Sequence, residues 1–304
     1  MITSSNDIPK LVLHPGFKVI GKWSGNSYTI QRLLGEGTSG KVYLVKCNQK
    51  CFALKVGLDD LSLQSEINVL KKVNEELGSS ERIFVESDDF ELQGDVFPYY
   101  IMKYIQGVDA KTYIQRNGYQ WFYLIGMNIL NQLQQLHKKN WIFGDIKVEN
   151  MIVSDYGSVT LIDYGGVTAK GRSVKQFTEI YDRGYWGKGN RKADEAYDLF
   201  SFAILCLILM DSISLSEIKS EQKKGAYLLK RAKMNPSCKH MIPFFEKAIY
   251  GKFQSTGHAC DEWKKLMYGA GFEQSKSIIL PWLEPALASS IFVFLLTLYL
   301  SFMH

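Results

Sequence analysis

The chain has 304 residues, of which 46% are hydrophobic and 22% are charged, and this ordinary globular composition argues against a disordered protein. The formal net charge of +5 is too weak to identify a partner. The five cysteines include no Cys-x-x-Cys pair, which argues against a disulfide framework or a zinc site and fits a reducing compartment. Residues 1–16 lack a basic region followed by an apolar core, so we expect no secretory signal.

The N-terminal third alternates apolar and polar residues around glycines, which is typical of strands. The predicted antiparallel strands are 28–34, 41–46 and 51–56. Residues 60–77 have apolar side chains at helical spacing and predict a helix, and residues 97–104 predict a further strand. The later part predicts helices at 111–117, 121–139, 197–211, 216–233 and 242–250. A small β-rich part before a larger helical part predicts a bilobal α+β fold with ligands at the seam.

The C-terminus carries an apolar run without charges, residues 286–303 (ALASSIFVFLLTLYLSFM). Its length meets the roughly 17–25 residues that a transmembrane helix needs. Pro281 and Pro285 suit a helix start, Trp282 suits the membrane interface, and lysines on the N-terminal flank indicate a cytoplasmic side. The alternative is a buried helix of the soluble domain, but the run has no polar face to present to water. We expect a single-pass membrane anchor after a linker at 271–285, with the preceding domain in the cytoplasm.

A glycine-rich turn follows the first predicted strand. Its members are Gly35, Glu36, Gly37, Gly40 and Val42. Glycines allow the backbone to turn tightly and let its N–H groups approach phosphates closely. The motif alone is weak, because many hairpins contain glycines. Its place between two strands favours a nucleotide-covering loop over a dinucleotide-binding turn, which would lie between a strand and a helix.

Ala53 and Lys55 lie in the apolar strand that follows this turn. An ammonium group there would be partly buried and would need a charged partner. The alternative is a lysine on an edge strand that faces water. We expect Lys55 to contact nucleotide phosphates and to be held by a carboxylate of the next helix. Glu66 is the best candidate, because Glu75 or Glu76 would leave too little chain for the strands before residue 102.

The segment 142–153 (IFGDIKVENMIV) carries the strongest chemical signal. Asp145 could accept a hydroxyl proton, Lys147 could neutralise a moving phosphoryl group, and Asn150 could supply an oxygen to a hard cation. A polar turn before a hairpin would look similar. However, a second acid, Asp163, follows on the far strand of the predicted hairpin. Two oxygen donors that meet across a hairpin predict a Mg²⁺ site, with Mn²⁺ as an alternative ion.

The order and spacing of these motifs resemble the Hanks-type protein kinases over roughly residues 28–268. The resemblance implies that Asp145 is the catalytic aspartate and that Lys147 marks a serine/threonine kinase. It implies that Lys55 and Glu66 form the pair between strand three and the following helix. Asn150 and Asp163 resemble the metal ligands, and Asp198 resembles the aspartate that holds the catalytic loop.

The resemblance also implies where the nucleotide binds and how the chain is divided. The implied nucleotide-binding residues are Gly35, Glu36, Gly37, Gly40, Val42, Ala53, Lys55, Met102, Tyr104 and Ile105. Met102 would be the gatekeeper before a hinge at 103–105. The expected divisions are an extension at 1–27 and a kinase domain at 28–270, with lobes at 28–104 and 105–270. Such a kinase would use ATP and Mg²⁺ to phosphorylate serine and threonine hydroxyls of protein substrates.

Three departures from the family pattern stand out. The usual His-Arg-Asp is Phe143-Gly144-Asp145, so the arginine that receives an activation-segment phosphate is missing. The usual Asp-Phe-Gly is here Asp163 followed by Tyr164 and a glycine, which is a mild change. The Ala-Pro-Glu motif is unrecognisable near residues 185–189, so we expect an unusual floor for the peptide substrate.

Two functional classes compete. The first is an active kinase, and the second is an inactive kinase fold that serves as a membrane scaffold or nucleotide sensor. The residues that discriminate are Lys55, Asp145, Asn150 and Asp163, because inactive relatives usually lack at least one of them. All four are present, so the sequence favours the active kinase. Candidate autophosphorylation sites are Thr168, Ser173 and Thr178.

Residues 170–192 and 217–240 each carry seven basic and two acidic residues. Solvated helix faces are the simplest interpretation. Contact with anionic lipid is a second, because an anchor would keep this lobe near the membrane. Sequence-independent contact with the backbone of DNA is a third. Binding to one polyanion would also bring two copies of the chain together as a dimer.

Overall fold

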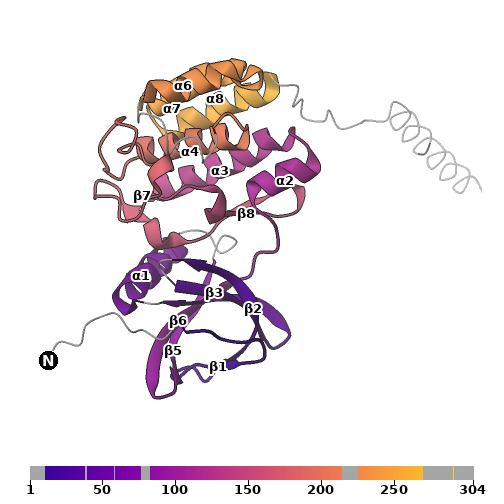
Figure 1. Ribbon diagram of the computed structural model, residues 1–304, viewed down its shortest axis with the longest axis vertical. Helices are drawn as coiled ribbons and strands as arrows, with labels where there is room; N and C mark the ends of the chain where they lie inside the picture. Colours follow the sequence, from indigo (N-terminus) through magenta and orange to yellow (C-terminus); the bar gives the residue numbers. More distant parts are fainter. Residues whose placement is uncertain are drawn as a thin grey trace, which may run out of the picture.

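The computed structural model describes residues 11–37, 40–57, 59–76, 83–213 and 225–269, together with Ser290. The described part has two lobes, a β-rich N-lobe and a helical C-lobe (Figure 1). The N-lobe sheet contains β1 (Lys18–Ile20), β2 (Ser27–Gly37), β3 (Gly40–Cys47), β4 (Lys50–Gly57), β5 (Phe84–Leu92) and β6 (Asp95–Lys103). Its strands are antiparallel in the order β1-β2-β3-β4-β6-β5. The bilobal fold expected from the sequence is therefore confirmed.

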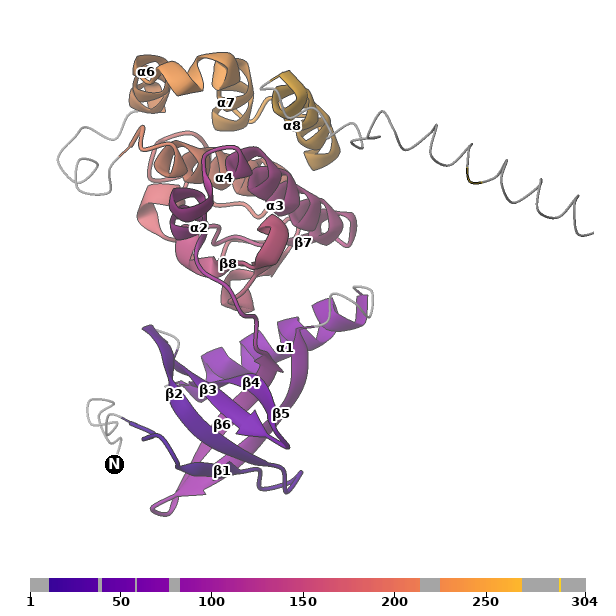
Figure 2. The ribbon, with the colours of Figure 1, turned by 90° about the vertical axis from the view of Figure 1, so that its right-hand side faces the viewer.

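Helix α1 (Asp60–Glu76) crosses the sheet on the side that faces the C-lobe (Figure 2). It buries Leu63, Ile67, Leu70 and Val73, the apolar stripe that its helical spacing predicts. The connection from β4 is short, because β4 ends at Gly57 and α1 begins at Asp60. An added Cβ at Gly57 would lie 2.7 Å from the Cβ of Leu63, so a glycine is needed for α1 to approach this closely.

The C-lobe is built around helices. These are α2 (Ala110–Asn117), α3 (Trp121–Lys138), α4 (Glu195–Leu209), α6 (Gly225–Met234), α7 (Ile242–Ile249) and α8 (Thr256–Gly269). Helix α4 is buried on nearly all sides, which explains its run of uncharged residues. Trp263 of α8 is fully buried, and an added Cβ at Gly126 would lie 2.2 Å from its ring. Two short pairs of strands complete the lobe, β7 (Trp141–Ile142) with β10 (Thr168–Ala169) and β8 (Met151–Val153) with β9 (Val159–Leu161).

The structure differs from the sequence expectations in a few elements. Strands β1 and β5 and helix α8 were not among the predicted elements. Residues 11–27, expected as part of an extension, contribute β1 to the sheet and bury Leu11 and Leu13 against its outer face. The helix expected at 216–233 is described only from Gly225 onward.

The expected anchor, residues 286–303, lies outside the described residues apart from Ser290. Within the ranges that the structure describes, no helix combines the length and the apolar character required to cross a bilayer.

Candidate active site

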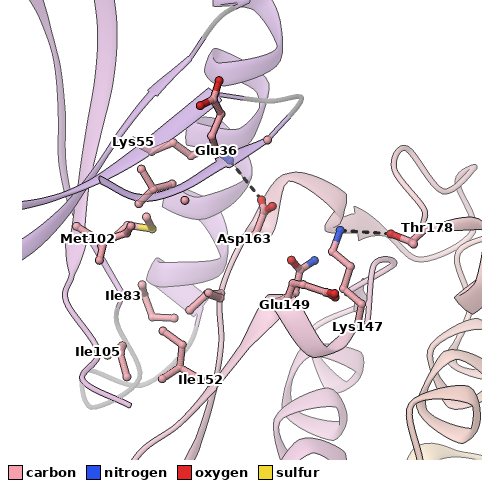
Figure 3. A pocket seen from close by; sticks show the side chains of 18 of the residues that line it. Glu36, Lys55, Ile83, Met102, Ile105, Lys147, Glu149, Ile152, Asp163 and Thr178 are labelled. Carbon is pink, nitrogen blue, oxygen red and sulfur yellow. Dashed lines mark hydrogen bonds and ion pairs between the residues drawn. The ribbon is translucent and has the colours of Figure 1, made fainter. Parts of the chain in front are cut away.

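A cleft of about 850 Å³ separates the two lobes. The glycine-rich turn lines it from above and the β8–β9 hairpin lines it from below (Figure 3). The cleft-lining residues that the sequence had indicated are Gly35, Glu36, Gly37, Gly40, Val42, Ala53, Lys55, Met102, Tyr104, Ile105, Lys147, Asn150 and Asp163. Apolar walls with a few convergent polar groups are typical of a small-molecule site. Ala53, Met102 and Ile152 belong to the apolar part of the lining, and Lys55 lines the same cleft.

Lys55 is held by two acids from different elements. Its Nζ lies 2.8 Å from both carboxylate oxygens of Glu66 and 3.3 Å from Oδ1 of Asp163. The Lys55 side chain is only 4% exposed, which is deeper than the partial burial expected from sequence. The choice of Glu66 agrees with this geometry, whereas Glu76 accepts a hydrogen bond from the indole of Trp141 instead. Removing one partner of such a buried pair would leave the other charge uncompensated.

Three residues converge on Asp145. Lys147 Nζ donates to its Oδ2 at 2.7 Å, and the Thr178 hydroxyl donates to its Oδ1 at 3.0 Å. Lys147 also donates to the Thr178 hydroxyl at 3.3 Å, as Figure 3 shows. Asn150 Nδ2 donates to the backbone carbonyl and to Oδ2 of Asp145, at 2.8 and 3.0 Å. The carboxylate thus receives three donor contacts, and a fourth holds the backbone carbonyl of the same residue.

Asn150 and Asp163 fit the role of cation ligands. The side-chain amide nitrogen of Asn150 donates to Asp145. The side-chain carbonyl oxygen of Asn150 is the kind of ligand that a hard cation prefers. Burial alone would raise the pKa of Asp163, but Lys55 and the Gly165 amide outweigh it and hold that pKa below its ordinary value. The carboxylate therefore stays ionised. Among the described residues no cluster of three or more His, Cys, Asp or Glu side chains is placed to hold a metal ion.

Asp198 organises the loop that carries Asp145. It is fully buried at the start of α4 and accepts from the backbone amides of Phe143 and Gly144, both at 2.8 Å. The ring of His137 contacts the same carboxylate at 2.8 Å. This is the role expected for Asp198. Phe143 is buried and packs edge-on against Tyr164, as an apolar residue at this position should.

Gly144 has a backbone conformation that favours glycine. Its φ is +81°, and an added Cβ would lie 2.8 Å from the carbonyl oxygen of Gly166. A side chain at this position would meet both backbone strain and a steric obstruction. The backbone conformation at residue 144 therefore favours glycine over arginine in this chain.

Residues 163–198, called the activation segment here, contain ion pairs close to the place where the Ala-Pro-Glu motif would lie. The fully buried Asp182 pairs with Arg191 at 2.8 Å and also accepts from the Tyr197 hydroxyl. Arg183 binds both carboxylate oxygens of Asp194 at 2.8 Å and donates to the carbonyl of Lys192. Bidentate pairs of this kind fix geometry as well as energy. These contacts hold residues 182–194 from within, and the unusual floor for the peptide substrate stays a prediction.

The candidate phosphorylation sites differ in their surroundings. Thr168 is 2% exposed and donates to the carbonyl of Gly166. The hydroxyl of Thr178 is engaged by Asp145 and Lys147. Ser173 is exposed. Of the three hydroxyls, that of Ser173 belongs to an exposed residue, whereas Thr178 contacts Asp145, which the sequence did not indicate.

Comparison with known proteins shows the family. The model of the protein kinase domain matches residues 28–266. The serine/threonine-protein kinase YabT of Bacillus subtilis (strain 168) is 37% identical over 266 residues, which span 85% of this chain and 76% of YabT. The serine/threonine-protein kinase CLA4 of Candida albicans is 26% identical over 66% of this chain and 22% of its own length. The structure of vaccinia related kinase 3 has a TM-score of 0.61 at 14% identity, over 86% of this chain and 92% of that one, which shows a shared fold.

The chain belongs to the protein kinase family and is a Hanks-type serine/threonine protein kinase. The likeness to YabT, which the arginine-less catalytic loop and apolar C-terminal run suggest, is confirmed at the level of sequence identity. Members of this family use ATP and a divalent metal ion to phosphorylate proteins. An inactive kinase fold is not favoured, because Lys55, Asp145, Asn150 and Asp163 are all present and assembled.

Proposed function

We propose that Asp145 accepts the proton of a substrate serine or threonine hydroxyl while that oxygen attacks the γ-phosphorus of ATP. The bond from the γ-phosphorus to the bridging oxygen breaks, and ADP leaves. Lys147 lies next to the attacking oxygen and offsets the charge that moves with the phosphoryl group. Lys55 holds the α- and β-phosphates. The observation that carries this proposal is the convergence of Lys147, Thr178 and Asn150 on one carboxylate.

Asn150 and Asp163 would hold the Mg²⁺ ion, which supplies charge neutralisation and orientation of the phosphates when it is bound. The test is the metal dependence of phosphoryl transfer. We expect Asp163→Asn to abolish transfer at any Mg²⁺ or Mn²⁺ concentration. We expect Asn150→Ala to raise the concentration of metal that is needed, and Asn150→Asp to restore part of the loss. Activity of the Asp163 variant equal to wild type would contradict this assignment.

Autophosphorylation is part of the proposal, with Ser173 as the acceptor. Ser173 is exposed, and Arg172, Lys175 and Lys192 beside it are exposed bases that suit a phosphate. The measurement is phosphopeptide mapping of the full chain after incubation with ATP. Phosphate on Ser173 that is absent from the Asp145→Asn variant supports the assignment, and phosphate confined to other residues contradicts it.

The basic segment 170–192 is a candidate contact for phosphate-bearing polymers or surfaces, either DNA or anionic lipid. Ion pairs occupy Lys170, Arg183 and Arg191, and Lys188 lies over the ring of Tyr250. The other three bases, Arg172, Lys175 and Lys192, are exposed to solvent. In the second segment only 225–240 is described, and there Arg231 donates to the carbonyl of Ser212. Steep salt dependence of binding to DNA but not to anionic vesicles would assign nucleic acid, the reverse would assign lipid, and binding to neither would end the proposal. Dimers that form only on the polyanion would support the expected pairing of copies.

The membrane anchor remains a proposal that rests on residues 286–303 alone. It places the chain in a membrane with the kinase domain in the cytoplasm. The full chain should require detergent for extraction from membranes, whereas residues 1–275 should not. Release of the full chain by high salt would contradict an anchor that spans the bilayer.

A further inference from the structure

A tyrosine on the strand beside Lys55 reaches the same glutamate that holds Lys55. Tyr100 of β6 is the direct cross-strand neighbour of Lys55 of β4. Its hydroxyl donates to Oε1 of Glu66 at 2.7 Å, and Lys55 Nζ donates to the same oxygen at 2.8 Å. Tyr100 is fully buried. The Glu66 carboxylate of α1 thus receives donors from two strands of the sheet.

We propose that Tyr100 is a positioning residue, whose hydroxyl fixes the Glu66 carboxylate and through it holds α1 and Lys55 in the arrangement that binds nucleotide phosphates. The inference rests on the phosphate-binding role proposed for Lys55. It concerns a residue that would touch neither ATP phosphates nor the acceptor hydroxyl.

The ring of Tyr100 is itself held firmly. It packs against Phe84 at a centroid distance of 6.5 Å, and Lys55 Nζ lies 6.0 Å from its centroid. With the ring fixed, the hydroxyl can reach only one oxygen of Glu66. Lys55 occupies the second oxygen at 2.8 Å, so rotation of the carboxylate would break contacts to both strands.

Outward movement of α1 would therefore leave three buried polar groups without partners: the Lys55 ammonium, the Glu66 carboxylate and the Tyr100 hydroxyl. Unpaired polar groups of this kind are strongly unfavourable in a protein interior. Burial raises the pKa of Glu66, and Lys55 and Tyr100 act in the opposite direction by favouring its ionised form. The short connection from Gly57, the last residue of β4, to Asp60, the first residue of α1, also limits how far α1 can move. Together these features hold α1 inward without an external partner.

The decisive variant is Tyr100→Phe, which keeps the ring and removes only the hydroxyl. Tyr28→Phe is a matched control, because the Tyr28 hydroxyl also donates to a glutamate, Glu86, at 2.8 Å, but lies on the outer face of the same sheet. Affinities for ATP and for adenosine are measured on the full chain, together with kcat for a protein substrate. Adenosine lacks the phosphates, so it reports cleft integrity without Lys55.

We expect Tyr100→Phe to weaken ATP binding and lower kcat by about tenfold, the usual weight of a hydrogen bond to a charged group, with adenosine affinity unchanged. Tyr28→Phe should change none of the three. Unaltered ATP affinity and kcat in Tyr100→Phe would overturn the inference. Equal losses of ATP and adenosine affinity would also overturn it, because they would indicate general damage to the cleft.

Two further variants separate this inference from its premise. Lys55→Met should lose ATP affinity; if it does not, the phosphate-binding role of Lys55 fails and this inference falls with it. If Lys55→Met behaves as expected and Tyr100→Phe does not, only the role of Tyr100 is overturned. A double-mutant cycle tests whether Tyr100 acts through Glu66, even if the single variants are partly destabilised. In a Glu66→Gln background, Tyr100→Phe should have much less effect on ATP affinity, and an unchanged effect would show that Tyr100 does not act through Glu66.

Discussion

The backbone amide of Gly144 donates a 2.8 Å hydrogen bond to the carboxylate of Asp198, which is 54 residues away in the sequence. This contact ties the catalytic loop to the buried helix α4 at the position where related kinases carry an arginine. Because the amide makes the contact, this hydrogen bond needs no side chain at residue 144. Asp145 keeps its contacts in a loop that lacks the arginine, and the absence of control through that arginine stays a prediction.

Adding a side chain at residue 144 should damage the enzyme. Gly144→Ala meets a positive φ and a carbonyl oxygen at 2.8 Å, so we expect a loss of about 2 kcal/mol in the free energy of unfolding and a fall in kcat. Gly171→Ala is the control, because Gly171 also has a positive φ but has open space for a Cβ. It should show the backbone strain without the loss of kcat. Equal kinetics for Gly144→Ala and wild type would be inconsistent with this explanation.

The hydroxyl of Thr178 should be needed for full kinase activity. Thr178→Val removes the contacts to Asp145 and Lys147 at nearly constant volume, and we expect kcat to fall about tenfold. Thr178→Ser keeps the hydroxyl and should recover most of that activity. The measurement is steady-state phosphorylation of a protein substrate. A Val variant as active as the Ser variant would show that the hydroxyl has no part in positioning Asp145.

The pair of Arg183 and Asp194 should stabilise the activation segment. Arg183→Met breaks a bidentate pair in which the arginine is 9% and the aspartate 31% exposed. After allowance for this exposure we expect a loss of about 2 kcal/mol in unfolding free energy, together with a higher KM for a protein substrate. Arg172→Met, on an exposed residue of the same segment, should change stability by no more than about 0.5 kcal/mol. Urea unfolding of the two variants compares them directly.

Glu195 should link stability to pH. Burial would raise its pKa, but hydrogen bonds from Lys170 and Thr256 outweigh burial and lower it. A lowered pKa stabilises the folded state above the ordinary glutamate value of about 4.3, and this contribution is lost as pH falls through the folded-state pKa. We therefore expect Glu195→Gln to be less stable than wild type by about 1 kcal/mol at pH 7. The difference should shrink below about pH 4; a difference that grows there would reverse the assigned sign.

Much of the fold and site could be predicted because kinase chemistry places charged residues in apolar segments at fixed spacing. Lys55, Asp145, Asn150 and Asp163 stand out for that reason, and short-range arguments on chain length selected Glu66 over its rivals. Strand β5 was not predicted, because its residues 86–91 are largely acidic and hide the strand pattern. Helix α8 was not predicted, because only a few of its residues are buried.

The roles of Thr178, Tyr100 and His137 could not be predicted, because each depends on contacts between residues far apart in the sequence. Thr178 lies 33 residues from Asp145, and His137 lies 61 residues from Asp198. Nothing in the local pattern distinguishes Thr178 or His137 from ordinary core or loop residues. Tyr100 did carry a usable signal, since strand alternation puts it on the same face as Met102, which lines the cleft.

The most direct test of the account is phosphoryl transfer by the full chain with labelled ATP and Mg²⁺, beside an Asp145→Asn variant whose ATP affinity is measured in parallel. We expect label on serine or threonine with the wild-type chain. The variant should bind ATP and transfer no label. Transfer by the variant at the wild-type rate, or no transfer by a wild-type chain that binds ATP, would contradict the role assigned to Asp145.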